Sequence, residues 1–430
     1  MDFRSLPDAP RVKLTNLTAP ACLLGEDGDL TPLSLVIDRA TGRIAPEGSS
    51  ADIEVDMARA MVMPCFVDAH THIDKGHIWG RAPNPDGTFI GALMTVGEDR
   101  RAHWNAEDVR TRADFSLRCA YAHGTRALRT HVDSVAPQPE ISWPVMRELR
   151  EDWAGRIALQ AVSLVAIDLL EPIGDGGATF QSLAALVAVS GGVLGAVTYP
   201  VPDLAARLDI FLSAADRLGI DVDFHVDETM DPTSRTLVEI ARAVLRTGYQ
   251  GRVTAGHCCS LSTQPRAEAE ACLDLVAEAG IAVISLPMCN MYLQDRHLDR
   301  TPRGRGVTLV QEMAARDIPI AFASDNTRDP FYAYGDLDML EVMREAVRIA
   351  HLDHGRADWP LAFTATPAEI CGFAPAALVP GAPADLVMFR GRSWTELLSR
   401  PQSDRIVLRA GRAIDRTLPD YAELDGIMGA

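Results

Sequence analysis

The sequence predicts an α/β fold: a (β/α)8 TIM-type barrel with a small β-sandwich domain formed by the N- and C-terminal segments. Three observations predict it. Between residues 61 and 365, short apolar runs alternate with stretches of helical composition. Both ends of the chain consist instead of short strand-like runs broken by Gly and Pro. Finally, polar side chains gather at the C-terminal ends of the apolar runs, which is where the functional sites of such barrels lie.

The two terminal segments have the composition of strands and turns. In the first, "LSLVIDRATGRIAPEG" alternates apolar and polar residues, turns at Ala-Thr-Gly and continues as a second strand, which predicts a hairpin. In the last, "GAPADLVMFRG" and "DRIVLRAGRAI" are short strands broken by Gly and Pro. We therefore predict that residues 1–60 and 366–430 pair into one small β-rich domain and that residues 61–365 form the barrel.

The middle of the chain, residues 61–365, contains eight short apolar runs. They lack clean alternation, which is typical of strands buried on both faces of a parallel sheet. Between most of them lie helical stretches such as "LAARLDIFLSAADRLG", and several of these end in the Gly that commonly stops a helix. Eight such units fit a closed barrel, with an open doubly wound sheet as the alternative. The runs are "MVMPCFVDAHTHI", "TRALRTHVD", "RIALQAVSL", "VLGAVTYP", "DVDFHVDE", "VTAGHCCS", "IAVISLP" and "IPIAFASDN".

Composition limits the class of protein. The 430 residues carry 41 basic and 59 acidic side chains and a net charge of −18, which argues against a broad nucleic-acid-binding face. No apolar run reaches the roughly 18–20 residues that a membrane span needs, and the N-terminus lacks the apolar core of a secretory signal. The eight cysteines contain no Cys-x-x-Cys pair, so a reducing compartment fits. We expect a cytoplasmic protein whose partner is a small molecule, with neither nucleic acid nor membrane bound.

Polar groups end most of the predicted strands. In a closed barrel these ends converge on one mouth, whereas purely structural polar residues would not be expected to concentrate at one end of each strand. This convergence is the strongest physical argument in the sequence for a functional site. The groups are His70 and His72 in the first run with Asp74 directly after it, His131 and Asp133 in the second, His225, Asp227 and Glu228 in the fifth, His257 in the sixth and Asp325 in the eighth.

His70 and His72 are two residues apart, so on a strand both imidazoles point to the same face. Taken alone, such a pair arises about as readily by chance on a buried strand. His225 and Asp325 add a third nitrogen and a carboxylate, and together the four suit a borderline divalent ion such as zinc or iron. An ion of this kind lowers the pKa of bound water from 15.7 toward about 7. The four residues therefore predict a metal site that supplies hydroxide at neutral pH.

Glu228 and His257 are the candidate catalytic residues beside that site. Glu228 lies three residues after His225, one step past the strand end, where its carboxyl group could carry a proton from the attacking water to a ring nitrogen. The structural alternative for Glu228 is a carboxylate in the first turn of a helix. His257 could contact the hydroxide or the nascent oxyanion, and its alternative is a lone buried strand histidine.

These residues stand in motifs that resemble the amidohydrolase superfamily, with "HTH", "HVDE", "GHCC" and "SDN" on strands one, five, six and eight. "RTHVD", "HVDE" and "DNTRDPFYAYG" resemble its cytosine deaminase-like branch, and "FVDAHTHIDK" is most similar to isopropylammelide hydrolase-like relatives. The resemblance covers nearly the whole chain and implies one divalent metal ion, zinc or iron. The implied ligands are His70, His72, His225 and Asp325. It also implies that Glu228 shuttles a proton, that His257 orients the hydroxide and that Asp325 accepts a proton from the water.

Departures from the cytosine deaminase pattern fall in the predicted substrate pocket. Ala166 stands where the pattern has a glutamine that holds the pyrimidine edge, although Gln160 lies upstream. Asn326 replaces a second aspartate, and it offers a donor and an acceptor but no charge. Phe331 follows strand eight and would either wall the pocket or pack in the core. We take Ala166, Asn326 and Phe331 as candidate substrate-binding residues, and cytosine itself is in doubt.

Lys75 is a further candidate, because it replaces an uncharged residue of the bacterial cytosine enzymes. A cation at the mouth would meet a carbonyl or anionic ring oxygen, or else form a salt bridge with Asp74 or Asp133. Lys75 also bears on the number of metal ions. Binuclear members of the superfamily usually bridge their metals with a carboxylated lysine that ends strand four, but here that strand ends "VTYP" and no lysine follows Lys75.

We interpret the chain as a metal-dependent hydrolase of C–N bonds other than peptide bonds, which deaminates a cytosine-, isocytosine- or triazine-like heterocycle. One alternative is hydrolysis of an N-alkylamino heterocycle or a cyclic amide on the same mononuclear site. Another is a barrel that binds a ligand without turnover. Relatives commonly associate, so a homo-oligomer is compatible with the sequence, although no segment identifies an interface.

Overall fold

The computed structural model describes residues 6–375 and 377–429 of the chain, which form two compact units. The first contains the chain up to Val67 together with Arg118–Ala127 and Asp338–Pro419. The second contains Asp68–Leu117, Leu128–Leu337 and the chain from Asp420. The domain boundaries predicted from the sequence, between residues 60 and 61 and between 365 and 366, stay a prediction.

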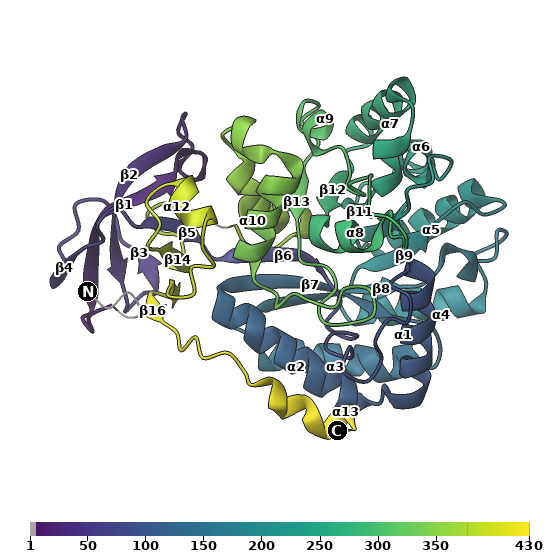
Figure 1. The fold of residues 1–430 in the computed structure, drawn as a ribbon, viewed down its shortest axis with the longest axis horizontal. Helices are drawn as coiled ribbons and strands as arrows, with labels where there is room; N and C mark the ends of the chain where they lie inside the picture. The colour runs from purple at the N-terminus through teal and green to yellow at the C-terminus, as the bar shows by residue number, and fades with distance from the viewer. Residues whose placement is uncertain (1–5, 376, 430) are drawn as a thin grey trace. The chain divides into compact units, whose positions relative to one another are not determined.

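Eight strands, one for each predicted apolar run, build the barrel. They are β6 (Phe66–Thr71), β7 (Thr125–Asp133), β8 (Ala158–Leu164), β9 (Leu194–Thr198), β10 (Val222–Val226), β11 (Val253–His257), β12 (Ala282–Ser285) and β13 (Ile320–Phe322). β6 to β8 form one sheet and β9 to β13 another (Figure 1). Parallel bridges join the two sheets at both edges, from Ala166 to Val197 and from Thr71 to Asp325. The ring is therefore closed, which confirms the barrel and excludes the doubly wound sheet.

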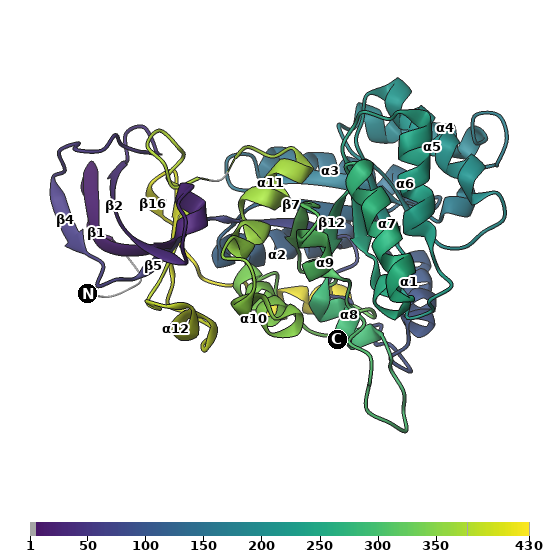
Figure 2. The same ribbon diagram turned by 90° about the horizontal axis from the view of Figure 1, so that it is seen from above.

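The barrel strands are buried as the sequence predicts for strands covered on both faces. Every residue of β10, β11 and β12 is buried. Helices lie outside the strands (Figures 1 and 2), and α5 and α6 end at Gly219 and Gly248, whose positive φ of 65° and 67° suits glycine. The longer helices are α1 (Phe89–His103), α2 (Ala106–His123), α3 (Gln138–Asp152), α4 (Ala178–Val189), α5 (Leu204–Leu218), α6 (Thr236–Thr247), α7 (Arg266–Glu278) and α10 (Met339–Ala350). The shorter ones are α8 (Pro287–Leu293), α9 (Val310–Ala314), α11 (Ala365–Cys371), α12 (Trp394–Leu398) and α13 (Asp425–Met428).

Strands from both terminal segments form a separate sheet in the first unit. Its order is β16-β15-β14-β5-β1-β2-β3, with β4 beside β1. The predicted hairpin is confirmed, because β2 pairs antiparallel with β3 across the turn. The two ends of the chain meet where β14 pairs antiparallel with β5. The strands are β1 (Arg11–Pro20), β2 (Leu30–Asp38), β3 (Arg43–Ile44), β4 (Ile53–Asp56), β5 (Met61–Pro64), β14 (Leu386–Phe389), β15 (Ile406–Arg409) and β16 (Arg412–Ala413).

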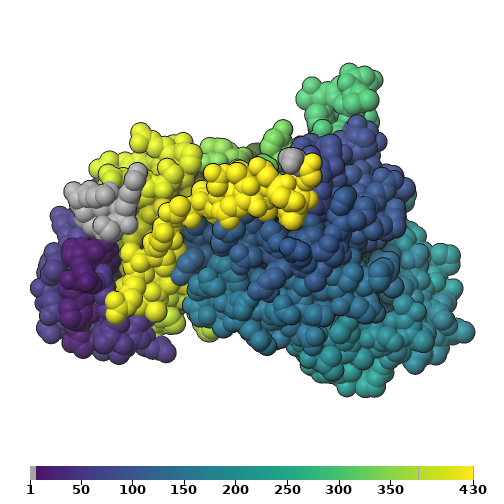
Figure 3. All heavy atoms as spheres, turned by 90° about the horizontal axis from the view of Figure 1, so that it is seen from below, coloured from purple at the N-terminus to yellow at the C-terminus, as the bar shows by residue number. Residues whose placement is uncertain are grey.

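Two surface features belong to the second unit. The loop between α8 and α9 projects outward (Figure 2). The C-terminal segment, residues 420–429, lies along the surface beside residues of the first barrel repeat (Figure 3). Arg81 holds that segment, because its Nη1 donates to the carbonyl oxygen of Ile427 at 2.9 Å. Among the described helices, none combines the length and the apolar character that crossing a membrane requires.

Candidate metal centre and active site

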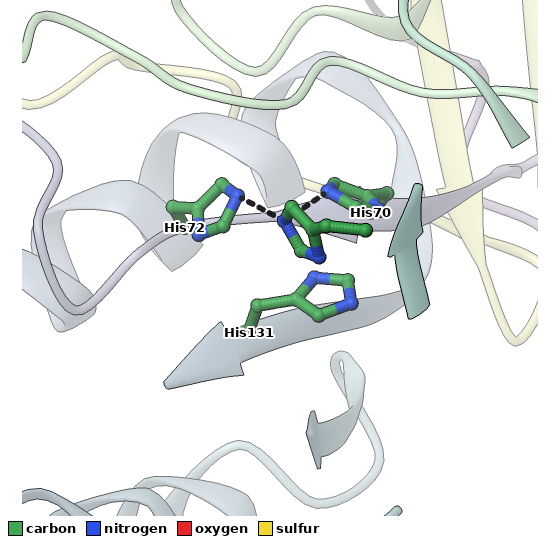
Figure 4. A group of neighbouring side chains, drawn as sticks. His70, His72 and His131 are labelled. Carbon is green, nitrogen blue, oxygen red and sulfur yellow. Dashed lines mark hydrogen bonds between the residues drawn. The ribbon is translucent and has the colours of Figure 1, made fainter. Parts of the chain in front are cut away.

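The four predicted metal ligands meet at the C-terminal mouth of the barrel. His70 lies in β6 and His72 one residue past its end, while His225 lies in β10 and Asp325 follows β13. The Nε2 atoms of His70 and His72 lie 3.1 and 3.3 Å from Nε2 of His225, and Figure 4 draws these contacts as dashed lines. Oδ1 of Asp325 lies 3.5 and 3.3 Å from the same two nitrogens. All four side chains are buried.

The chemistry of these four groups fits a divalent ion. Lone pairs on nitrogens so close together repel unless a proton or cation lies between them. Burial lowers the pKa of all three imidazoles, with a smaller contribution from the neighbouring cationic and imidazole groups, and this favours the neutral form that binds metal. Both carboxylate oxygens of Asp325 are buried without a hydrogen-bond partner among the described residues. A tetrahedron with metal–nitrogen bonds of about 2.0 Å has edges of roughly 3.3 Å, close to the observed spacings.

His131 supports His70 from the neighbouring strand. Its ring centroid lies 3.9 Å from that of His70. Nε2 of His131 contacts Oδ1 of Asp223 at 3.1 Å, and Oδ2 of Asp223 accepts from Arg129 at 2.7 Å. A Cβ at Gly256 would lie 2.9 Å from Cε1 of His70, so glycine leaves room for the imidazole. The sequence marks the strand end at His131 but assigns it no role, and no local pattern shows that Asp223 would meet it.

Glu228 lies between the predicted metal ligands and helix α8. Its Oε1 accepts from Nδ2 of Asn290 at 3.4 Å and lies 3.5 Å from Nδ1 of His257. Burial, with the nearby charge of Asp325, raises the pKa of the carboxyl well above its usual range. The carboxylate at the start of α6 belongs instead to Asp227, which accepts from the backbone N–H groups of residues 236 and 237 at 3.0 and 3.1 Å. Glu228 is therefore left facing the site, where its protonated form persists to higher pH.

His257 is fixed by Asn290, a residue that the sequence analysis missed. Nδ2 of Asn290 donates to Nδ1 of His257 at 3.0 Å, so Nε2 carries the ring proton. That nitrogen is buried without a protein partner among the described residues. Burial lowers the pKa of His257 to about 3, which keeps the imidazole neutral. His257 and Asp325 both have positive φ, 69° and 65°, a conformation that non-glycine residues adopt mainly where the surrounding structure enforces it.

Lys75 forms the predicted salt bridge to Asp133. Its Nζ donates to Oδ1 of Asp133 at 2.7 Å, and Nη1 of Arg100 donates to the other oxygen at 2.8 Å. Asp74 does not pair with the ammonium group; its Oδ2 accepts from the backbone N–H of Asp133 at 2.8 Å. The ammonium lies 5.7 Å from the ring centroid of Phe331. Lys75 is thus held at a fixed place in the mouth with a cation–π neighbour.

The amide of Asn326 is engaged within its own turn. Its Nδ2 donates to Oδ2 of Asp329 at 2.7 Å, and the thiol of Cys289 donates to its Oδ1 at 3.6 Å. Oδ1 of Asp329 also accepts from the backbone N–H of Phe331 at 2.8 Å. Asn326 therefore holds the segment after β13, including Phe331, whose ring lies 5.4 Å edge-to-face from that of Phe89.

Ala166 and Gln160, the two residues near β8 considered for substrate binding, have different surroundings. Ala166 is partly buried just past the strand, at the bridge to Val197. Gln160 lies further back in β8, and its Oε1 accepts from Nε of Arg129 at 2.7 Å. Gln160 is therefore occupied inside the barrel, and Ala166 leaves no polar side chain at the position where the cytosine deaminase pattern has a glutamine.

A closed barrel whose strand ends carry three imidazoles, a carboxylate and a nearby glutamic acid is an arrangement typical of metal-dependent hydrolases. A family model described as "Amidohydrolase family" matches residues 148–414, and the chain belongs to this family.

Known proteins resemble the chain over about three quarters of its length or more. The pterin deaminase of Rhizobium rhizogenes (strain K84 / ATCC BAA-868) is 54% identical over 437 residues, covering 100% of this chain and 99% of that protein. The N-isopropylammelide isopropyl amidohydrolase of Pseudomonas sp. (strain ADP) is 24% identical over 331 residues, which covers 74% of this chain and 76% of the relative. Among solved structures, 5-methylcytosine deaminase from Klebsiella pneumoniae has a TM-score of 0.77 at 25% identity and covers 94% of this chain and 97% of its own.

These likenesses confirm the predicted amidohydrolase superfamily, and a cytosine deaminase is among the structures that resemble the chain. They also confirm that the chain is a hydrolase acting on C–N bonds, so the alternative of a barrel without turnover is set aside.

Proposed function

We propose that the chain hydrolytically deaminates an amino-substituted N-heterocycle, with one divalent metal ion, zinc or iron, held at the barrel mouth. The proposed ligands are His70, His72, His225 and Asp325. The observation that carries the proposal is the convergence of their ligand atoms, 3.1–3.5 Å apart, beside the carboxyl group of Glu228. The metal would make water acidic enough to supply hydroxide near neutral pH.

Three side chains of this chain would handle the protons. Glu228 would protonate the ring nitrogen next to the reacting carbon, and its raised pKa supports this role because the carboxyl group retains a proton to donate. Asp325 would accept the proton that the attacking water loses. His257 would donate from Nε2 to the oxygen that develops negative charge, since Asn290 already occupies its Nδ1. Asp325 would then pass its proton to the amino group, which leaves as ammonia, while Glu228 would regain a proton from the hydroxyl group on the reacting carbon, which becomes a carbonyl carbon.

The substrate we propose is a bicyclic ring with the isocytosine pattern, as in pterin. The support is the pterin deaminase that is 54% identical over the whole chain. Pterin contains a 2-amino-4-oxopyrimidine, so the predicted isocytosine-like ring is favoured over the cytosine- and triazine-like ones. Lys75, Ala166, Asn326 and Phe331 are the proposed substrate-binding residues. Lys75 would approach the ring carbonyl oxygen, and the methyl group of Ala166 would leave space for the second ring.

A substrate panel tests this function. Purified protein, analysed for zinc and iron, would be assayed for ammonia release from pterin, isocytosine, cytosine and aminotriazines, and for alkylamine release from an N-alkylated triazine. We expect pterin to be turned over with the highest kcat/KM. Release of alkylamine in preference to ammonia would favour the alternative, hydrolysis of an N-alkylamino heterocycle. Equal rates for pterin and cytosine would overturn the proposal that the substrate is bicyclic. The cytoplasmic location and association into a homo-oligomer stay predictions.

A further inference from the structure

A second set of groups that could hold a metal ion shares Asp325 with the first. A carboxylate oxygen of Glu228, Sγ of Cys289 and a carboxylate oxygen of Asp325 all lie within 4.8 Å of one another. Cys289 projects from α8, the helix that follows β12, and is fully buried. Three different elements of the barrel therefore bring one thiol and two carboxyl groups to the same point.

Asp325 provides the independent indication that this set can bind an ion. Its Oδ1 faces the nitrogens of His70 and His72, at 3.5 and 3.3 Å, while Oδ2 is also buried, and the side-chain donor beside this carboxyl group among the described residues is the weakly donating thiol of Cys289. An unpaired carboxylate oxygen in a buried site is costly unless a donor or cation meets it. With Oδ1 directed at the three-histidine centre, Oδ2 remains available to a second ion.

The donor set selects a particular class of ion. Thiolate is a soft ligand that favours zinc and heavier ions such as cadmium, whereas carboxylates alone would suit magnesium or calcium. Sulfur and oxygen donors within 4.8 Å of each other require only small side-chain rotations to approach the roughly 2.0–2.3 Å bonds of a zinc site. The thiol would release its proton to solvent as the metal–sulfur bond forms.

We propose that Glu228, Cys289 and Asp325 form a second, inhibitory site for a soft divalent ion, zinc or cadmium, that shares the carboxylate of Asp325 with the first. The binding claim stands on the donor geometry alone. The inhibitory claim rests on the proposed function, because an ion bound to Glu228 removes the carboxyl group that donates a proton to the ring. Excess zinc would then inhibit a deaminase that needs one metal ion for turnover.

The binding claim is tested by titrating the metal-loaded protein with cadmium and recording the ultraviolet band of thiolate-to-cadmium charge transfer. We expect one further cadmium ion per chain together with this band. The band must disappear in Cys289→Ser and Cys289→Ala, two variants checked for folding by circular dichroism. It must persist in Cys272→Ser, a matched control in which a buried cysteine of α7 is replaced. A band that survives in both Cys289 variants overturns the proposal, as does cadmium that only exchanges into the first site, whose nitrogen and oxygen ligands give no thiolate band.

The inhibitory claim has a separate readout. Zinc would be added beyond one equivalent, and the rate of each protein would be compared with its own rate at one equivalent. We expect the zinc concentration for half-inhibition to rise at least tenfold in Cys289→Ser and to stay unchanged in Cys272→Ser. Equal inhibition of all three proteins would overturn this claim. Failure of the proposed function would leave no turnover on any panel substrate, while the cadmium band would still report the second site.

Discussion

Two adjacent layers of polar side chains fill the barrel interior, and they differ in how their groups are paired. In the lower layer, Nη1 of Arg129 donates to Asp223 at 2.7 Å and to Thr254 at 3.0 Å, and its Nε donates to Gln160 at 2.7 Å. In the upper layer, the facing nitrogens of the three imidazoles proposed as metal ligands and Oδ1 of Asp325 lie 3.1–3.5 Å from one another. Both layers are almost entirely buried.

The contrast separates the buried groups that support the site from those proposed to bind the metal ion. Two residues separate the layers along a strand, as with Asp223 and His225 on β10, so both point into the barrel. His131 links them, since its Nε2 contacts Asp223 while its ring packs on His70. A buried layer whose charges are paired fixes geometry, whereas facing acceptors in a buried layer are stabilised by a proton or a cation between them.

Removing one upper-layer ligand gives the largest expected effect. His225→Ala should lower metal content below a tenth of an equivalent and reduce kcat/KM by on the order of 10⁴-fold or more, because the reaction loses its source of hydroxide. Metal analysis and ammonia release measure the two effects. Circular dichroism should stay native, because the paired lower layer is intact. His103→Ala, at the exposed end of α1, is the control. Full metal content in His225→Ala would show that the upper layer is not the metal centre.

Glu228→Gln separates proton transfer from metal binding. The amide keeps the size of the side chain and its contact with Asn290 but has no proton to exchange at neutral pH. We expect kcat to fall by on the order of 10²–10⁴-fold with metal content unchanged. Glu278→Gln, an exposed residue at the end of α7, is the control. Near-native turnover of Glu228→Gln with metal bound would remove Glu228 from the mechanism.

The sequence predicted the strand ends better than the contacts between them. His70 and His72 could be identified because a period of two places both on one face of a strand, and His225 and Asp325 because each ends another apolar run. The link from His131 to Asp223 depends on which residues of two strands nearly a hundred positions apart face each other, and local pattern carries no such information.

The same limit applied to the substrate side of the site. The sequence allows Lys75 two salt-bridge partners, Asp74 and Asp133, and only the fold selects Asp133. Asn290 and Cys289 lie on a short helix after β12, in a stretch with no motif that the sequence analysis could use. Their roles follow from where α8 places them over Glu228 and Asp325.

Breaking the ion pair between Arg129 and Asp223 tests whether the lower layer stabilises the fold. Arg129→Met leaves Asp223 buried without its ion-pair partner, and we expect a loss of roughly 3–5 kcal/mol in the free energy of unfolding. Urea unfolding of the metal-loaded protein measures it. Arg129→Met combined with Asp223→Asn should recover part of the loss, since no buried charge is then unpaired. Arg392→Met, which breaks an exposed pair with Glu396, is the control and should leave the midpoint unchanged.

Asp338, in the first unit, is another buried carboxylate that is paired with an arginine. Its effect on the pH dependence of stability is the smallest that we predict. Burial alone would raise the pKa of Asp338, but Nη1 and Nη2 of Arg405 at 2.7 and 2.6 Å, with a contribution from His123, hold it below its usual range. The unfolded chain has an aspartate pKa of about 3.9, so below that pH it binds a proton that the native state does not. The stability from this pair is therefore fully present above about pH 5 and is lost as the pH falls through the native pKa.

Asp338→Asn should flatten the dependence of the urea midpoint on pH between about 5 and 3, whereas Asp317→Asn, an exposed residue, should leave it as in the parent protein. An unchanged slope in Asp338→Asn would mean that pairing of a buried carboxylate does not produce the acid sensitivity of this fold.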